Sequence, residues 1–443
     1  MLKKNYKLSF YYFCVNLIQK INFSKIFFMK FFLSFIFCLS LSFYVFSQNL
    51  LIEDQVYDSN VKTVLLYPER SVLQAPAIPL SQEIPLILEF DMLGSEAENF
   101  AVQIVNCDRN WHISQLNQVE YLEDYNEFYI RDRNYSFNTK VSYTHYRFVV
   151  PKVKVSGNYL LKVYEDRNES RLILSKRFMV FSEDASVQSA LGQVTGVETA
   201  FRNQQIDFNI DYSGYDIPNP QEQIKVVIRQ NFRWDNAIQE LAPTYVQEYK
   251  NQLQYKYFNL ENSFKGGNEF RMFDSRNAQA RGIHVREIVQ NPDRNEMILA
   301  SDLNRSDQIY SKNFEDINGR FFVQNILGKD PMLDSDYVNV VFSLKVPLEI
   351  NKKVFLAGSF TNWQLKPEFE MLYSDFLQTY QAILLLKQGF YNYQYTLVDQ
   401  NLKQKDDAFF EGSYFQTENN YEIFVYYRPY SSRSDLLIGY KVL

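Results

Sequence analysis

The feature that most constrains this fold is the absence of any sustained helical period after residue 48. No segment there keeps apolar residues at helical spacing for three turns, whereas apolar and polar residues alternate repeatedly, as in residues 206–211. A period of two is the pattern of a strand with one face buried. The sequence therefore predicts an all-β protein.

The first 48 residues differ from the rest and are set aside from the fold. They contain six lysines and no acidic residue, and an apolar run covers residues 31–46. That run is shorter than the roughly 20 residues that a membrane-spanning helix needs. We predict a signal peptide over residues 1–48, with Met29 as a candidate for the true start, and no membrane insertion after its cleavage. An uncleaved anchor helix is the alternative.

The mature chain, residues 49–443, is acidic and keeps one cysteine. Without the six leader lysines, 40 basic residues face 52 acidic ones, a formal charge of −12. This charge argues against nucleic acid as a partner. Because Cys14 and Cys38 lie in the leader, Cys107 is left without an intrachain partner. Hydrophobic cores rich in aromatic residues must then stabilise the chain.

Linker-like segments divide the mature chain into three successive immunoglobulin-like or early-set β-sandwich domains. Residues 183–196 are small and polar, and residues 328–336 are acidic and contain proline, as is typical of linkers. The predicted domains are 49–183, 184–327 and 328–443. The last is predicted to close with strands 421–427 and 436–442.

One tyrosine of the first domain has a pattern of its own. Gly157-Asn158-Tyr159 resembles the tyrosine corner of immunoglobulin-like folds, in which the phenol binds upstream backbone. An ordinary strand tyrosine is the alternative.

No group of residues predicts catalysis or a bound metal. Cys107 and His112 are conceivable as a nucleophile and its base, but they are separated by a polar turn, and a half-buried thiol at a strand end is the preferred interpretation. His145 is expected to be solvated or hydrogen-bonded. The acidic residues at 330, 334 and 336 lack the spacing of a calcium loop, so a solvated linker is expected. We predict that the protein is not an enzyme and has no catalytic, cofactor-binding or metal-binding residue.

Two segments near the end carry a first resemblance. Residues 354–363 and 389–395 are similar to the glycogen-binding, early-set modules found beside starch and glycogen enzymes. The resemblance implies that Trp363 stacks on a sugar. However, the lysine of the second motif is replaced by Gln394, and no tryptophan follows Asp399. A Trp363 that caps its own core is the preferred alternative to glycan stacking.

A second resemblance extends over the whole mature chain. It rests on scattered motifs at residues 106–111, 120–122, 136–138, 143–146, 156–166, 233–238, 266–271, 318–320 and 427–429. Together they resemble the type IX secretion system plug protein family of Bacteroidetes. The resemblance implies a non-enzymatic periplasmic protein that docks in the periplasmic end of the outer-membrane translocon barrel and seals its pore between export events. A glycan-binding periplasmic protein that uses Trp363 is the alternative function.

The long loop of the first domain offers candidate contacts for such a partner. Its aromatic residues alternate with acidic ones, and they are Tyr121, Tyr125, Phe128 and Tyr129. They are either displayed as anchors for a partner or packed onto their own sandwich.

Overall fold

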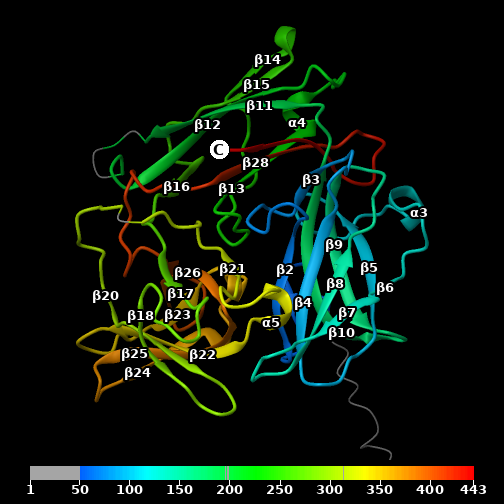
Figure 1. The fold of residues 1–443 in the computed structure, drawn as a ribbon. Coiled ribbons are helices and arrows are strands. Elements are labelled where there is room, and N and C mark those ends of the chain that lie inside the picture. The colour runs from blue at the N-terminus through cyan, green and yellow to red at the C-terminus, as the bar shows by residue number, and fades with distance from the viewer. Residues whose placement is uncertain (1–49, 195, 197–198, 313) are drawn as a thin grey trace, which may run out of the picture. The chain divides into compact units, whose positions relative to one another are not determined.

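Strands form where the sequence alternates, and they account for nearly all of the regular structure (Figure 1). The structure is a computed structural model that describes residues 50–443 except 195, 197–198 and 313. The expected signal peptide, with Met29, lies outside the described residues. The all-β prediction is confirmed, because the described helices are short turns: α3 (Gln118–Tyr121), α4 (Pro220–Gln223), α5 (Pro331–Asp334), η1 (Glu248–Lys250), η2 (Ser359–Thr361) and η3 (Pro367–Phe369). None of these helices is long and apolar enough to cross a membrane.

The first sandwich is built from one contiguous stretch of chain. One sheet has the order β2 (Val61–Pro68), β4 (Leu86–Leu93), β8 (Tyr143–Val149) and β7 (Asp132–Tyr135). The facing sheet has the order β1 (Gln55–Val56), β10 (Asn168–Phe181), β9 (Gly157–Glu165), β5 (Phe100–Cys107) and β6 (Phe128–Tyr129), and β3 (Ala77–Pro79) pairs with β10. Phe100, Val102 and Ile104 point into the core between them, as their alternation predicts.

The tyrosine corner of this sandwich is confirmed, and a second corner occurs elsewhere. The Tyr159 hydroxyl donates a hydrogen bond to the Val155 carbonyl at 2.6 Å. In the same way, the Tyr391 hydroxyl donates to the Lys387 carbonyl at 2.6 Å, after Gly389. In both places a glycine two residues before the tyrosine opens the strand.

The middle sandwich combines strands from distant parts of the chain. Its larger sheet has the order β11 (Ser186–Gln193), β12 (Asn203–Asp211), β15 (Gln252–Tyr255) and β14 (Tyr245–Gln247), and β16 (Ser263–Lys265) pairs with β12. Its smaller sheet has the order β13 (Ile224–Gln230), β28 (Tyr421–Tyr427) and β29 (Leu436–Val442). In Figure 1 the red β28 accordingly lies beside the green β13.

The third body is an eleven-stranded sheet that folds around its own core. Its main order is β17 (Arg271–Asp274), β26 (Gly389–Val398), β23 (Lys353–Ala357), β24 (Glu370–Ser374), β25 (Thr379–Lys387), β22 (Tyr337–Lys345), β19 (Glu296–Leu299) and β18 (Val285–Val289). β20 (Asp302–Leu303) pairs with β22, and β21 (Phe321–Val323) and β27 (Lys405–Asp406) pair with β26.

Strand pairing therefore crosses the limit expected at residue 328. The strands from β17 to β21 precede that limit but belong to the third sheet, whereas β28 and β29 follow it but complete the middle sandwich. The two strands at 421–427 and 436–442 form as predicted, yet in another sandwich than expected. Alternation identifies a strand and its buried face, but it does not identify the strand's partner.

Candidate functional site

The turn at residues 106–111 lies where the first sandwich meets the middle one. The Asp108 carboxylate accepts the backbone N–H groups of Asn110 and His112, both at 2.9 Å, and this holds the turn. The backbone N–H of Arg109 donates to Asp435, which precedes β29, at 2.8 Å. The Trp111 ring packs edge-on against Trp234, with 5.0 Å between the ring centroids. The motif therefore joins two sandwiches.

The chemistry of Cys107 agrees with a structural role. The thiol is fully buried, and burial together with the nearby Asp108 charge raises its pKa to about 12. A thiolate is the reactive form of cysteine, so this thiol is held in its unreactive form at neutral pH. The exposed His112 ring contacts Asp108 at 3.4 Å.

The four aromatic residues of the long loop divide into two pairs. Tyr121 is buried, and its hydroxyl donates to the Ile104 carbonyl at 3.0 Å. Phe128 is partly buried against the same core. Tyr125 and Tyr129 are 80% and 46% exposed. The prediction that all four side chains are displayed is therefore wrong for Tyr121 and Phe128, which pack onto the core of the first sandwich. Tyr125 and Tyr129 are exposed and remain available to a partner.

Trp363 follows η2 in a tight turn and is closely surrounded. Asn362 and Trp363 both have left-handed backbone, with φ of 50° and 58°. The Arg233 guanidinium lies over the Trp363 ring at 4.3 Å, and the Phe270 ring contacts it edge-on. A Cβ atom added at Gly319 would lie 2.6 Å from the same ring, so this position needs glycine. Glycan stacking on Trp363 stays a hypothesis, with one ring face already covered by Arg233.

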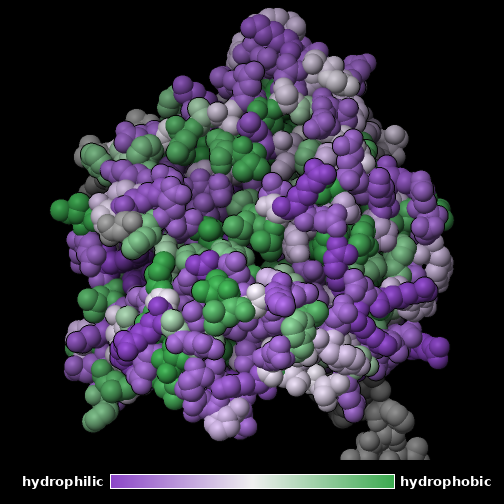
Figure 2. Space-filling view, in the orientation of Figure 1, coloured by the Kyte–Doolittle hydropathy of each residue, from purple (hydrophilic) through white to green (hydrophobic). Residues whose placement is uncertain are grey.

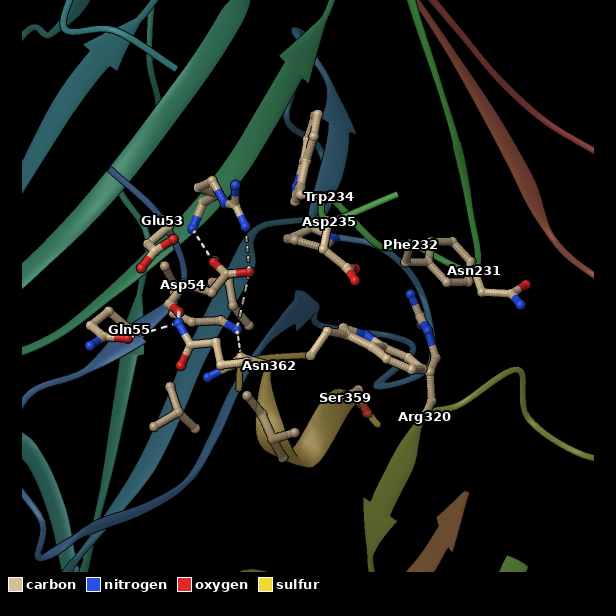
Figure 3. A pocket seen from close by; sticks show the side chains of 18 of the residues that line it. Glu53, Asp54, Gln55, Asn231, Phe232, Trp234, Asp235, Arg320, Ser359 and Asn362 are labelled. Carbon is tan, nitrogen blue, oxygen red and sulfur yellow. Dashed lines mark hydrogen bonds and ion pairs between the residues drawn. The ribbon is translucent and has the colours of Figure 1, made fainter. Parts of the chain in front are cut away.

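A cavity of about 690 Å³ adjoins Trp363. It is lined by the segment before β1, by β10, by the turn after β13 and by the turn that holds Trp363. Figure 3 shows Glu53 and Asp54 on one side of the cavity and Phe232 with Arg320 on the opposite side. Because every sandwich contributes to its wall, this cavity is the concave site most central to the fold.

The acidic segment around α5 is not the solvated linker that the sequence predicted. Two of its carboxylates are buried and accept hydrogen bonds from backbone N–H groups. Asp334 accepts the backbone N–H of Asp330 at 2.9 Å, and Asp336 accepts those of Lys140 and Val141 at 3.1 Å each. Both carboxylates are buried. Within residues 50–443 as described, no group of three or more His, Cys, Asp or Glu side chains is placed to hold a metal ion.

Comparison with known proteins identifies the family. The family model "Type 9 secretion system plug protein 1st domain" matches residues 61–182, which is the first sandwich. A crystal structure of a hypothetical protein from Parabacteroides merdae is 31% identical, with a TM-score of 0.85, over 89% of this chain and all of that one. The chain belongs to the type IX secretion system plug protein family. No curated protein matches this chain.

A buried charge network joins the first sandwich of the protein to its third sheet. Asp91 on β4 accepts hydrogen bonds from His145 Nδ1 at 2.8 Å, from the Tyr337 hydroxyl at 2.6 Å and from Lys387 Nζ at 2.7 Å. Lys387 also donates to the Met332 carbonyl at 2.7 Å, and its ammonium lies 4.1 Å from the centre of the Tyr143 ring. Four members of the network are buried: Asp91, His145, Tyr337 and Lys387.

The network fixes the protonation state of its members. Burial alone lowers the pKa of His145, but its hydrogen bonds to Asp91 and Glu89 raise it to about 9. Burial raises the pKa of Asp91, yet the Lys387 charge and the His145 hydrogen bond bring it below its usual value. His145 is therefore hydrogen-bonded, which is one of the two environments that the sequence allowed. Its ring is positively charged at neutral pH.

Sequence reasoning missed this network and the cavity. Asp91 and Lys387 are far apart in the sequence, and no local pattern pairs them. A signal was nonetheless present, because both charges interrupt or end apolar runs: Leu86–Leu93 around Asp91, and residues 382–386 before Lys387. A charge in a buried strand is rarely tolerated without a partner.

Proposed function

We propose that this protein is a non-enzymatic periplasmic plug that docks in the periplasmic end of the type IX translocon barrel and seals its pore between export events. The observation that carries the proposal is the match of the first sandwich to the plug-family model. The family places the protein in type IX secretion, and the sealing of the barrel is the finer step that we add.

The interlocked fold suits a stopper for a wide aqueous pore. The chain leaves the middle sandwich after β16, forms the third sheet and returns to pair β28 with β13, so two connections join the two bodies. That pairing also holds a buried ion pair, in which Arg229 donates to both Glu422 carboxylate oxygens. A bidentate, buried pair of this kind is costly to separate. The body should therefore resist deformation when it bears on a pore.

The surface suits a protein that is soluble before it docks. Figure 2 shows hydrophilic residues over most of one face, with apolar residues in separate patches. Tyr129 lies on β6, at the edge of its sheet, and Tyr125 stands out from the preceding loop. Exposed tyrosines are frequent anchors of protein interfaces because they bury a large area at little entropic cost. We assign these two residues to the contact with the barrel.

Deletion of the gene, with complementation, tests the proposal. We expect the purified barrel to lose this chain as a co-purifying subunit, and the outer membrane to admit large hydrophilic solutes. The leak should vanish when the barrel gene is deleted as well. A barrel that never carries this chain, together with unchanged permeability, would refute the sealing function.

A double variant sharpens the test of the contact. Tyr125→Ala with Tyr129→Ala should reduce recovery of the protein on the tagged barrel by about tenfold or more, since anchor residues typically contribute 1 kcal/mol or more each. The matched control is Tyr249→Ala, because Tyr249 is 81% exposed on the middle sandwich. Equal recovery of the double variant and the control would move the contact to another surface.

A further inference from the structure

The central cavity has a charge opposite to that of the chain. Its wall carries six cationic side chains, Lys176, Arg177, Arg229, Arg320, Lys366 and Lys405, against three acids, Glu53, Asp54 and Asp235. The whole chain has a formal charge of −6. A cavity lined by positive charge focuses the electrostatic potential of its wall and raises the local concentration of anions, even in a protein that is acidic as a whole.

Several of these cations already have partners within the fold. Arg229 is held by Glu422, and Lys405 contacts Asp235 at 3.1 Å. Lys176 and Arg177 share Asp54, at 3.7 Å each. Asp54 and Asp235 are therefore already paired, and the wall still carries more positive than negative side chains.

Arg320 has no ion pair within the described part of the chain, although the Glu422 charge, which is already paired with Arg229, attracts it. Among the described residues, no carboxylate pairs with its guanidinium and no side-chain acceptor receives its N–H groups. Its guanidinium lies over the Phe232 ring, at 3.6 Å from the ring centre. The side chain is partly buried, and this burial lowers its pKa to about 10. A partly buried cation without a counter-ion destabilises the folded state.

Arg177 supplies a second unused donor. Its Nε atom is buried and has no hydrogen-bond acceptor. Buried donors in folded proteins are nearly always satisfied, and an exception calls for an explanation. Arg177 thus adds to the positive charge of the wall, while Arg320 carries the N–H groups that an acceptor from outside the chain could reach.

The backbone around the cavity is strained where it presents aromatic rings. Asn231 and Phe232 have φ of 52° and 62°, and Asn362 and Trp363 have φ of 50° and 58°. Bulky residues rarely adopt left-handed backbone, and such strain gathers at ligand sites. Both turns line the cavity, so each brings one aromatic ring to its wall.

We propose that this cavity binds a small organic anion, with Arg320 holding a carboxylate or phosphate group and the rings of Phe232 and Trp363 lining the space for its planar or apolar part. A guanidinium fork binds the paired oxygens of either group. The cavity volume falls within the range of small-molecule sites. This inference stands apart from the sealing of the pore, and either can fail alone.

Titration of the mature protein with defined probes tests the site. Benzoate and phenyl phosphate represent the two anion sources, inorganic phosphate lacks the ring, and benzamide is the neutral match of benzoate. Two of the three tryptophans, Trp234 and Trp363, line the cavity, so tryptophan emission at constant ionic strength reports binding. We expect a saturable change with at least one ring-bearing anion and none with benzamide.

A charge-removing variant locates the anchor. Arg320→Gln should weaken binding of the effective anion at least tenfold, whereas Arg281→Gln, at an exposed arginine, should leave it unchanged. The free Arg320→Gln protein should unfold at the same or a higher temperature, because it loses a partly buried cation. The absence of saturable binding by every anion in the wild type, or unchanged binding by Arg320→Gln, would overturn the proposal. If Arg320→Gln fails to fold, the wild-type comparison of benzoate with benzamide decides it.

Discussion

The first sandwich meets its two neighbours through junctions of different chemistry. Toward the middle sandwich, the junction combines the hydrogen-bonded turn at residues 106–111 with an apolar cluster in which Leu160 and Met179 pack against Phe424 and Leu437. Toward the third sheet, it is the hydrogen-bonded network around Asp91. Apolar contact is non-directional and scales with buried area, whereas hydrogen bonds require one geometry. Among the described residues, the apolar cluster is found only at the junction with the middle sandwich, and the buried charges around Asp91 are found only at the junction with the third sheet.

The largest effect is expected at the junction with the third sheet. Lys387→Met removes one of the two cations that Asp91 binds and leaves only His145, which should lower the free energy of unfolding by about 3–5 kcal/mol. Urea denaturation measures it, with Lys345→Met at an exposed position of β22 as the control. The double variant Asp91→Asn with Lys387→Met should recover part of the loss, since residue 91 then carries no charge that needs Lys387. Equal stability of Lys387→Met and the control would show that the network does not hold the junction.

Truncation in the apolar cluster should rank second. Leu437→Ala removes a fully buried side chain from the cluster, at an expected cost of about 2–5 kcal/mol. Leu348→Ala, at a leucine that is 76% exposed, should stay within about 0.5 kcal/mol of wild type. The Leu437→Ala loss should be the same at pH 6 and pH 9. A loss of stability that varies with pH would contradict the statement that apolar contact dominates the cluster around Leu437.

The stability of the junction with the third sheet should depend on pH, because His145 titrates there. The pKa of His145 is about 9 in the folded protein and about 6.5 in an unfolded chain. Its stabilising contribution is therefore fully present below pH 6.5 and is lost as pH rises through 9. Unfolding curves between pH 6 and 10 should show wild type losing stability, on the order of 1–3 kcal/mol by the conversion of pKa units to energy. His145→Gln should lose less over that interval, and parallel curves would contradict the assignment.

The smallest effect is expected for glycans at Trp363. Because Arg233 covers one face of the ring, native gels that contain α-glucans should retard wild type and Trp363→Ala equally. Retardation of wild type alone would revive the glycan-binding hypothesis for the cavity region.

The sequence was informative wherever structure depends on neighbouring residues. The alternation in β5 and β12 and the corner at Tyr159 are local patterns, and the structure confirms them. The partner of β28 and the pairing of Asp91 with Lys387 depend on packing between distant segments, and periodicity carries no record of them. The burial of Tyr121 was also outside its reach, because alternation with acidic residues in a loop does not reveal which rings meet a core.

The return of β28 and β29 to the middle sandwich sets an order for folding. A nascent chain that has reached residue 183 already holds every strand of the first sandwich, and domains whose strands are all available can fold during synthesis. The middle sandwich must wait for residues 436–442, after the third sheet has been made. Until β28 has been made, β13 lacks its strand partner and is a template for unwanted pairing. The last two strands thus complete the middle sandwich, β28 by pairing with β13 and β29 by pairing with β28, and a chain that lacks them stays exposed to aggregation and to proteases.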